Sequence, residues 1–151
     1  RFRPHPETIK RFPEIKDIYK NICVSKNFIF DDSPDNLSAM NDSKCLITDN
    51  SGISIEFLLV FKKPIIFYDR FEKIHNPKFS MYQNLDTIEE KIKKKFGTKF
   101  SQTDISNLEV AISKSFQNFD ISSLNVFINE NFYNYGNTID FIDENFLDIC
   151  I

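Results

Sequence analysis

The sequence has little of several residue types that mark particular protein classes. Its 151 residues include 3 glycines, 6 prolines and no tryptophan, which excludes collagen-like and low-complexity architectures. The glycines lack the spacing of a dinucleotide-binding fingerprint, and neither a P-loop nor a Ser-His-Asp set is apparent. No stretch approaches the roughly 20 apolar residues of a membrane span. The whole sequence, with 41% hydrophobic and 27% charged residues, is typical of one globular domain.

The sequence also lacks a large excess of either basic or acidic residues. Nineteen basic and 22 acidic residues give a net charge of −3, without a basic stripe, so we expect no nucleic-acid partner. The one basic run, residues 91–95, follows Glu89 and Glu90 on a predicted helix. Acids at the start and bases at the end of a helix are typical of a solvated face.

The three cysteines are Cys23, Cys45 and Cys150, an odd number with wide spacing. Neither His5 nor His75 clusters with them. We therefore expect free thiols in a reducing cytoplasm and no metal site.

Apolar runs predict an α/β domain. Residues 44–48 and 64–68 read as buried strands joined by a helix over residues 53–61, which predicts a right-handed parallel βαβ unit. Strands that are apolar on both faces require helices on both sides of the sheet. The fold expected is a Rossmann-like parallel sheet with a helical C-terminal segment.

The other elements follow from periodicity and turn signals. Residues 2–4 are expected to be extended and residues 69–84 mostly loop. We expect Leu37 and Met40 to face the core in the helix over residues 36–40, and Leu108, Ile112 and Phe116 in the helix over residues 105–116. Gly97 is expected to end the helix over residues 87–96. The predicted helices cover residues 7–12, 14–20, 36–40, 87–96, 105–116 and 138–149.

The turn Asp49-Asn50-Ser51-Gly52 follows the first strand and opens a helix. Ligands of open α/β sheets bind at this edge. We expect Ser51 to cap the helix and the N–H groups of Gly52, Ile53 and Ser54 to point outward, forming a diphosphate pocket that a side chain at position 52 would obstruct. The alternative is a well-capped helix that binds nothing.

Three further side chains are candidates for the same ligand. Glu56 is the only charge between Asp49 and Lys62, so it either accepts hydrogen bonds from ribose hydroxyls or faces solvent. His5, held between two prolines, is a candidate donor to phosphate, and Arg3 a source of charge, although this segment also reads as plain loop. His75 is a weaker candidate.

Taken together, these motifs resemble the C-terminal domain of the CDP-glycerol glycerophosphotransferase family. The resemblance is carried by Arg-Pro-His-Pro at the start, by Thr-Asp-Asn-Ser-Gly followed by Ile-Ser-Ile-Glu-Phe, and by Lys-Lys-Pro-Ile-Ile-Phe-Tyr. It extends to about Gly97, and residues 132–137 with the final helix resemble the closing segment of that domain. Those enzymes build teichoic acids and related surface polymers on a two-domain GT-B scaffold.

The resemblance implies a transferase that works in a cleft between two domains. Arg3 and His5 would lie near the diphosphate, Ser51 and Gly52 on its phosphates, and Glu56 on the ribose. Asp49, Asn50 and Ile53 would belong to the same nucleotide-binding turn, and the catalytic residue stays unknown, with His5 as one option. An acceptor hydroxyl would attack the phosphoryl or anomeric centre of a CDP- or UDP-linked donor, with no further cofactor required.

The resemblance also sets expectations for the whole protein. Residues 1–151 would form one nucleotide-binding domain, a fragment inactive without its N-terminal GT-B partner domain. The acceptor would be a polymer or glycolipid, and the location cytoplasmic, peripheral to the inner membrane face in the full-length protein.

Two alternatives stay open. The family typically has an aromatic residue at position 50 and a hydroxyl at position 52, where this chain has Asn50 and Gly52. That pair is similar to the Ser-Gly-Gly turn of non-hydrolysing UDP-N-acetylglucosamine 2-epimerases, which suggests an epimerase-like domain. The other alternative is a non-catalytic α/β binding module.

Overall fold

The computed structural model describes residues 1–22, 27–49, 51–68, 86–101 and 106–149, with side chains to residue 144. The chain divides into two compact units, Arg1–Ser43 and Lys44–Ile151. Each unit has its own packing. The expectation that the whole chain forms a single nucleotide-binding domain stays a prediction, and the loop expected over residues 69–84 lies outside the described residues.

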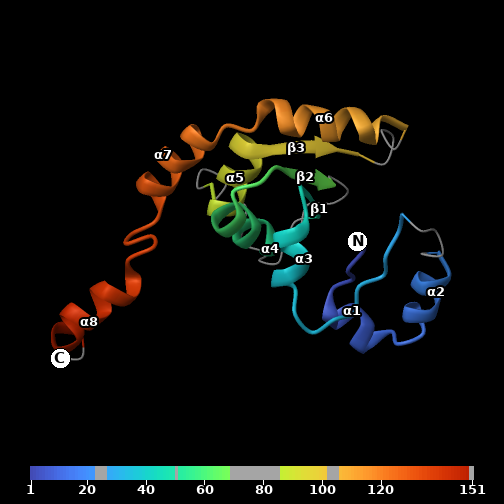
Figure 1. Ribbon diagram of the computed structural model, residues 1–151, viewed down its shortest axis with the longest axis horizontal. Coiled ribbons are helices and arrows are strands. Elements are labelled where there is room, and N and C mark those ends of the chain that lie inside the picture. Colours follow the sequence, from blue (N-terminus) through green and yellow to red (C-terminus); the bar gives the residue numbers. More distant parts are fainter. Residues whose placement is uncertain (23–26, 50, 69–85, 102–105, 150–151) are drawn as a thin grey trace. The chain divides into compact units, whose positions relative to one another are not determined.

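In its described residues, the first unit contains three short helices and one strand-like pairing; Figure 1 shows the helices. The helices are α1 (Pro6–Arg11), α2 (Ile15–Ile22) and α3 (Leu37–Asp42), each within two residues of its predicted end. Phe2 is extended, as predicted, and forms a parallel bridge with Phe30. Aromatic rings surround this bridge, with Phe2 at 4.9 Å from Tyr19 and 6.1 Å from Phe28 between ring centroids.

One inward prediction for α3 is wrong. Met40 is buried as expected, but Leu37 is 57% exposed and Ala39 is the second buried residue. Leu37 occupies the first position of a six-residue helix, where the Asp35 carboxylate accepts its backbone N–H at 2.9 Å. The segment before α3 therefore fixes its rotation, and the short apolar pattern alone does not.

The second unit is built on a parallel sheet in the order β1-β2-β3. Its strands are β1 (Leu46–Thr48), β2 (Ile65–Tyr68) and β3 (Gly97–Phe100). Leu46 pairs with Ile65 and Ile65 with Gly97. The predicted parallel βαβ unit is confirmed. The expectation that β1 is a buried strand is wrong, since it lies at an edge of the described sheet and its Ile47 is 45% exposed.

Helices cover both faces of this sheet, as predicted (Figure 1). On one face Ile66 and Phe100 pack with Ala111 of α6 (Leu108–Asn118). On the other face the Phe67 ring lies 5.9 Å from the Lys93 amine of α5 (Ile88–Phe96). The α5 start is acidic and its end basic, as expected, although Lys93 is buried rather than solvated.

The α6 helix buries a different stripe from the one predicted. Leu108 and Ile112 are partly buried against the Ile66 cluster, in agreement with the prediction. Phe116 is 45% exposed, and the small residues Ala111 and Ser115 are the buried ones. Small side chains let α6 approach the sheet closely, which leaves no room for a ring in that stripe.

The connection between β1 and β2 is helical over the predicted residues 53–61, but its two halves differ. It begins as α4 (Ile53–Glu56) and continues as the π-helix η1 (Phe57–Phe61). Phe57 and Leu58 are fully buried. Lys62 ends the helix in the left-handed conformation, with φ at 50°, and its N–H donates to the Leu58 carbonyl. We call residues 53–61 the crossover helix.

The C-terminal part is helical, as predicted. It contains α7 (Ile121–Asn131) and α8 (Thr138–Ile149), and the α8 bounds match the expected range. The sequence analysis missed both α7 and β3. The signal for α7 was Asp120, whose carboxylate caps the helix by accepting the N–H groups of Ser122 and Ser123, both at 3.0 Å.

Gly97 permits a close approach between α5, β2 and β3. A Cβ atom at this position would lie 2.5 Å from Phe67 and 2.7 Å from the Lys93 carbonyl oxygen. We expect Gly97→Ala to lower the free energy of unfolding by about 1–3 kcal/mol, the usual cost of overpacking. Urea denaturation measures this loss.

Gly52→Ala is the matched control, because no heavy atom lies within 4 Å of its Cβ position. Its unfolding free energy is expected to stay within about 1 kcal/mol of the wild type. An equal loss in both variants would contradict the close-approach explanation for Gly97.

Candidate functional site

The candidate turn lies where the sequence analysis expected it. β1 ends at Thr48, the Ser51 N–H donates to the Asp49 carbonyl at 2.9 Å, and α4 begins at Ile53. Asp49 and Gly52 are exposed, and Ser51 is half-buried. The turn therefore stands at the carboxyl end of a parallel strand, the edge at which ligands of α/β sheets bind. Asn50 lies outside the described residues.

The capping prediction for Ser51 is wrong. Gly52 occupies the N-cap position, and no side chain caps the helix. The Ser51 carbonyl instead accepts two hydrogen bonds from Ser54, one from its N–H at 3.1 Å and one from its hydroxyl at 2.8 Å. The Ser54 N–H is thus already used. Gly52 and Ile53 carry the remaining backbone N–H groups of this first turn, for which a helix has no internal acceptor.

The absence of a side chain at Gly52 is not required by the fold. Its φ of −56° is ordinary for any residue, and the space around its Cβ position is open. A glycine in such a place leaves the turn accessible from outside. This is the feature that close approach of a phosphate oxygen to the backbone would need.

Glu56 is the last residue of α4 and its side chain is exposed. Since it is not buried, it carries no desolvation cost that a partner must compensate. It lies one helical turn beyond Gly52, so it shares the helix with the candidate phosphate turn. This geometry agrees with both readings of Glu56, ribose contact or solvent-facing carboxylate.

His5 belongs to the first unit and has a defined structural role there. It is the N-cap of α1, and its Nδ1 atom accepts the Glu7 N–H at 3.2 Å. An accepting Nδ1 carries no proton, so in the neutral ring the proton is on Nε2. His5 therefore presents one N–H donor, which is the group that a phosphate contact would use.

Arg3 is anchored by the segment that precedes α3. Its guanidinium donates to the Ser33 carbonyl at 2.5 Å and to the Ser33 hydroxyl at 3.1 Å, and it lies 3.3 Å from the Asp31 carboxylate. These contacts use much of its donor capacity within the first unit. Its expected role at a diphosphate stays a prediction.

The Asp31 carboxylate is the centre of this network and is 9% exposed. Hydrogen bonds from the Ser33 hydroxyl at 2.6 Å and the Ser33 N–H at 3.1 Å, with the charges of Arg3 and Arg1, hold its pKa below the usual value, while burial opposes them. Its other oxygen is buried without a hydrogen-bond partner in the described part of the chain. The network ties Arg3, and with it the segment leading to His5, to residues 31–35.

Among the described residues, no group of three or more His, Cys, Asp or Glu side chains could hold a metal ion. In the same part of the chain, no helix has the length and apolar character to cross a membrane. Cys45 is a free, half-buried thiol whose pKa is raised by burial. His75, Cys23 and Cys150 lie outside the described residues.

Comparison with known families gives a match over the first part of the chain. The model of a family described as CDP-glycerol:poly(glycerophosphate) glycerophosphotransferase matches residues 2–89, more than half of the chain. The matched range includes His5, the turn at Gly52 and Glu56. No curated protein and no solved structure matches the chain.

The Asp31 network leads to a prediction about pH. A carboxyl whose pKa is lowered by folding adds stability above its ordinary pKa, and this contribution is lost as the pH falls through the folded value. Asp31→Asn should therefore weaken the first unit at neutral pH and flatten its loss of stability as the pH falls below the ordinary pKa of an aspartate, 3.8. Hydrogen exchange of the Phe2 amide, which donates to the Ile29 carbonyl, measures this.

Asp42→Asn is the control for this experiment. Asp42 also faces Arg1, at 3.9 Å, but its side chain is 59% exposed, so its pair adds little stability. A wild-type pH profile in the Asp31 variant would show that the network does not hold the unit together.

Proposed function

The chain belongs to the CDP-glycerol:poly(glycerophosphate) glycerophosphotransferase family, and on this premise we propose that its second unit binds the nucleotide of a CDP- or UDP-activated donor. The observation that carries the proposal is the turn at Gly52. It stands at the carboxyl end of β1, opens the crossover helix and has open space where a side chain would be. The donor diphosphate would lie against the N–H groups of Gly52 and Ile53.

Glu56 supports the nucleotide part of the proposal. A carboxylate accepts hydrogen bonds and donates none, and the two ribose hydroxyls of a nucleotide are donors. Glu56 is exposed and lies one turn along the helix from Gly52, so it is accessible to a ribose attached to the phosphates. A contact with ribose would explain why this otherwise apolar segment carries a single charged residue.

The chemistry proposed is transfer of glycerophosphate to an acceptor hydroxyl. The acceptor oxygen forms a bond to the glycerol-bearing phosphorus and gives up its proton to a base or to water. The bond from that phosphorus to the bridging oxygen breaks, and the nucleoside monophosphate leaves with the bond electrons. Backbone donors at a helix N-terminus stabilise the negative charge that develops on these oxygens. The roles of Arg3 and His5 toward the donor, including catalysis by His5, stay predictions.

We propose further that this chain is the donor half of a GT-B enzyme and has no turnover alone. The supporting argument is the family membership, since the resemblance implies a cleft between two domains of which this chain matches one. In this proposal the complete enzyme extends a surface polymer or glycolipid from the cytoplasmic side of the membrane.

The first test compares nucleotide binding in the wild type and Gly52→Ala. CDP and UDP at millimolar concentration are expected to raise the melting temperature of the wild type by mass action. The added methyl group should weaken CDP binding by about 1–3 kcal/mol because it fills the space of a phosphate oxygen. Calorimetric titration measures the affinity.

The fold of Gly52→Ala is expected to be retained, which its unfolding curve verifies. A folded wild type whose melting temperature neither nucleotide changes would contradict the proposal. Binding of UDP without CDP would favour the epimerase-like candidate, which Asn50 and Gly52 suggest.

The second test is a double-mutant cycle on the ribose contact. Glu56→Gln should weaken CDP binding by about 1.5 kcal/mol, the lower end for a hydrogen bond to a charged group, because Glu56 is exposed. Replacing CDP by its 2′,3′-dideoxy analogue should cost a similar amount. The two losses should not add, since both remove the same interaction.

Glu109→Gln is the matched control. Glu109 is an acidic residue in the first helical turn of α6 and is not part of the candidate nucleotide site at Gly52. It should leave the affinity for both ligands unchanged. Additive losses in the cycle would show that Glu56 does not contact the ribose and faces solvent.

A further inference from the structure

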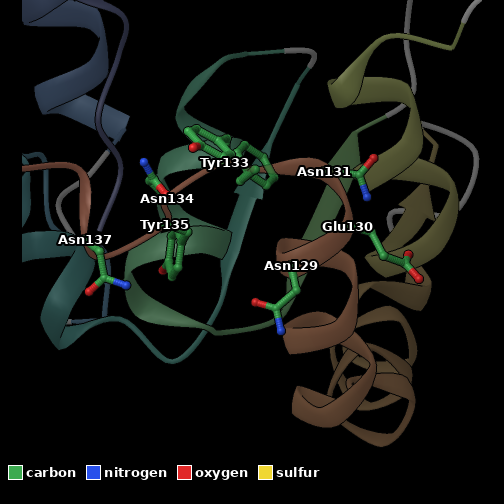
Figure 2. Close-up of a pocket in the computed structure, with 8 residues that line it drawn as sticks. Asn129, Glu130, Asn131, Tyr133, Asn134, Tyr135 and Asn137 are labelled. Carbon is green, nitrogen blue, oxygen red and sulfur yellow. The ribbon is translucent and has the colours of Figure 1, made fainter. Parts of the chain in front are cut away.

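A pocket of about 520 Å³ lies beside the connection between α7 and α8, residues 132–137 (Figure 2). All of its lining comes from the second unit, and none of it from the turn at Gly52. Figure 2 shows Asn129, at the end of α7, on one side and Tyr135, in the connection, on the other. Amide and phenol side chains make up much of the lining: Asn129, Asn131, Asn134, Asn137, Tyr133 and Tyr135.

The pocket is held open by contacts to the rest of the unit. The Tyr135 hydroxyl donates to the Leu59 carbonyl of the crossover helix. The Asn131 amide donates to the Phe127 carbonyl at 2.8 Å and accepts from the Lys91 amine at 3.2 Å. These two residues therefore act as braces, and the pocket walls do not depend on a ligand to keep their places.

The lining side chains select a ligand by their hydrogen-bonding type. Amides donate and accept, as hydroxyl groups do, and Asn129 and Asn137 are exposed to whatever enters. Among the described residues that line the pocket, Glu130 is the one charged residue, and the nearby Lys91 amine is already bonded to the Asn131 side chain. This composition fits a neutral ligand rich in hydroxyl groups and disfavours an anion such as phosphate.

Asn134 supplies an unusual feature. It has a left-handed backbone, with φ at 51°, and its side-chain nitrogen is buried without a hydrogen-bond partner in the described part of the chain. A buried donor of this kind is uncommon and is unfavourable for the free protein. A small rotation of the amide toward an entering hydroxyl oxygen would satisfy it.

Tyr133 adds a hydrophobic surface at the same place. Its side chain is 81% exposed, and an edge contact with Phe141, at 5.6 Å between ring centroids, orients the ring. An exposed ring beside several amides offers its face to the C–H groups of a polyol or sugar while the amides take the hydroxyls.

We propose that this pocket binds a neutral polyhydroxylated unit, a sugar ring or a polyol, separately from the donor nucleotide. Leu59, which accepts the Tyr135 bond, is seven residues along the crossover helix from Gly52, a separation of roughly 10 Å. The pocket is therefore braced near the far end of that helix from the diphosphate turn. It is a binding subsite rather than the place of transfer, and its existence does not depend on the proposed function.

The test uses the full 151-residue chain labelled with ¹⁵N and titrated with methyl α-D-glucopyranoside, with glycerol and with inorganic phosphate. Either of the first two should shift the side-chain amide signals of Asn129 and Asn137, and the stronger binder tells whether a ring or a linear polyol is preferred. Phosphate should not shift them. Equal or stronger binding of phosphate would overturn the proposal.

Two variants test the assignment to this pocket. Tyr133→Ala removes the exposed ring, and Asn134→Gly removes the amide while keeping a residue that accepts positive φ. Each should weaken binding of the preferred probe about tenfold. Ile139→Ala, at a 75% exposed residue of α8 outside the lining, should change nothing.

Absence of shifts with both polyhydroxylated probes, or equal weakening by Ile139→Ala, would overturn the proposal. CDP titration of the same variants gives an independent readout. We expect CDP binding to be unchanged, so failure of the pocket proposal and failure of the nucleotide proposal can be told apart.

Discussion

Strand β2 can be stable only if both of its edges and both of its faces are covered, because Ile65, Ile66 and Phe67 are almost fully buried. The edges are covered by parallel pairing with β1 and β3, and the faces by α5 and α6. Parallel pairing with β1 requires a crossover long enough to return the chain, and the crossover helix supplies it. The position of the candidate turn follows, since a crossover helix must begin at the carboxyl end of the strand before it.

The sequence predicted this central arrangement because its signals are local and strong. Two apolar runs at helix-length separation specify a βαβ unit almost regardless of what surrounds them. The sequence could not predict β3, because Gly97–Phe100 has no apolar run and its close approach to Phe67 is a tertiary contact. The prediction for Ser51 failed for a similar reason. A turn with Asp, Asn and Ser predicts a helix capped by a side chain, but the backbone geometry places Gly52 at the N-cap.

The errors in burial have a shared cause. Leu37, Ile47 and Phe116 are apolar but exposed, each in an element whose buried partner the sequence does not identify. Periodicity gives the face of a helix or strand that is apolar, whereas the neighbours decide how much of that face is covered. The pocket beside residues 132–137 was missed for a related reason. Asn and Tyr residues in a connection read as loop, and the pocket exists because Tyr135 reaches back to Leu59.

The charges of the candidate turn limit how tightly it can bind a donor by itself. Residues 49–56 contain two carboxylates, Asp49 and Glu56, and no Lys or Arg. A helix N-terminus adds about 0.3–1 kcal/mol per exposed negative charge, and a ribose contact to the exposed Glu56 about 1.5 kcal/mol. Summed over the negative charges of a diphosphate, these contributions reach at most roughly the 4 kcal/mol of a millimolar complex. Tighter binding would need cations from outside residues 49–56, so if this family uses the turn for its donor, the affinity must be completed by residues elsewhere in the enzyme.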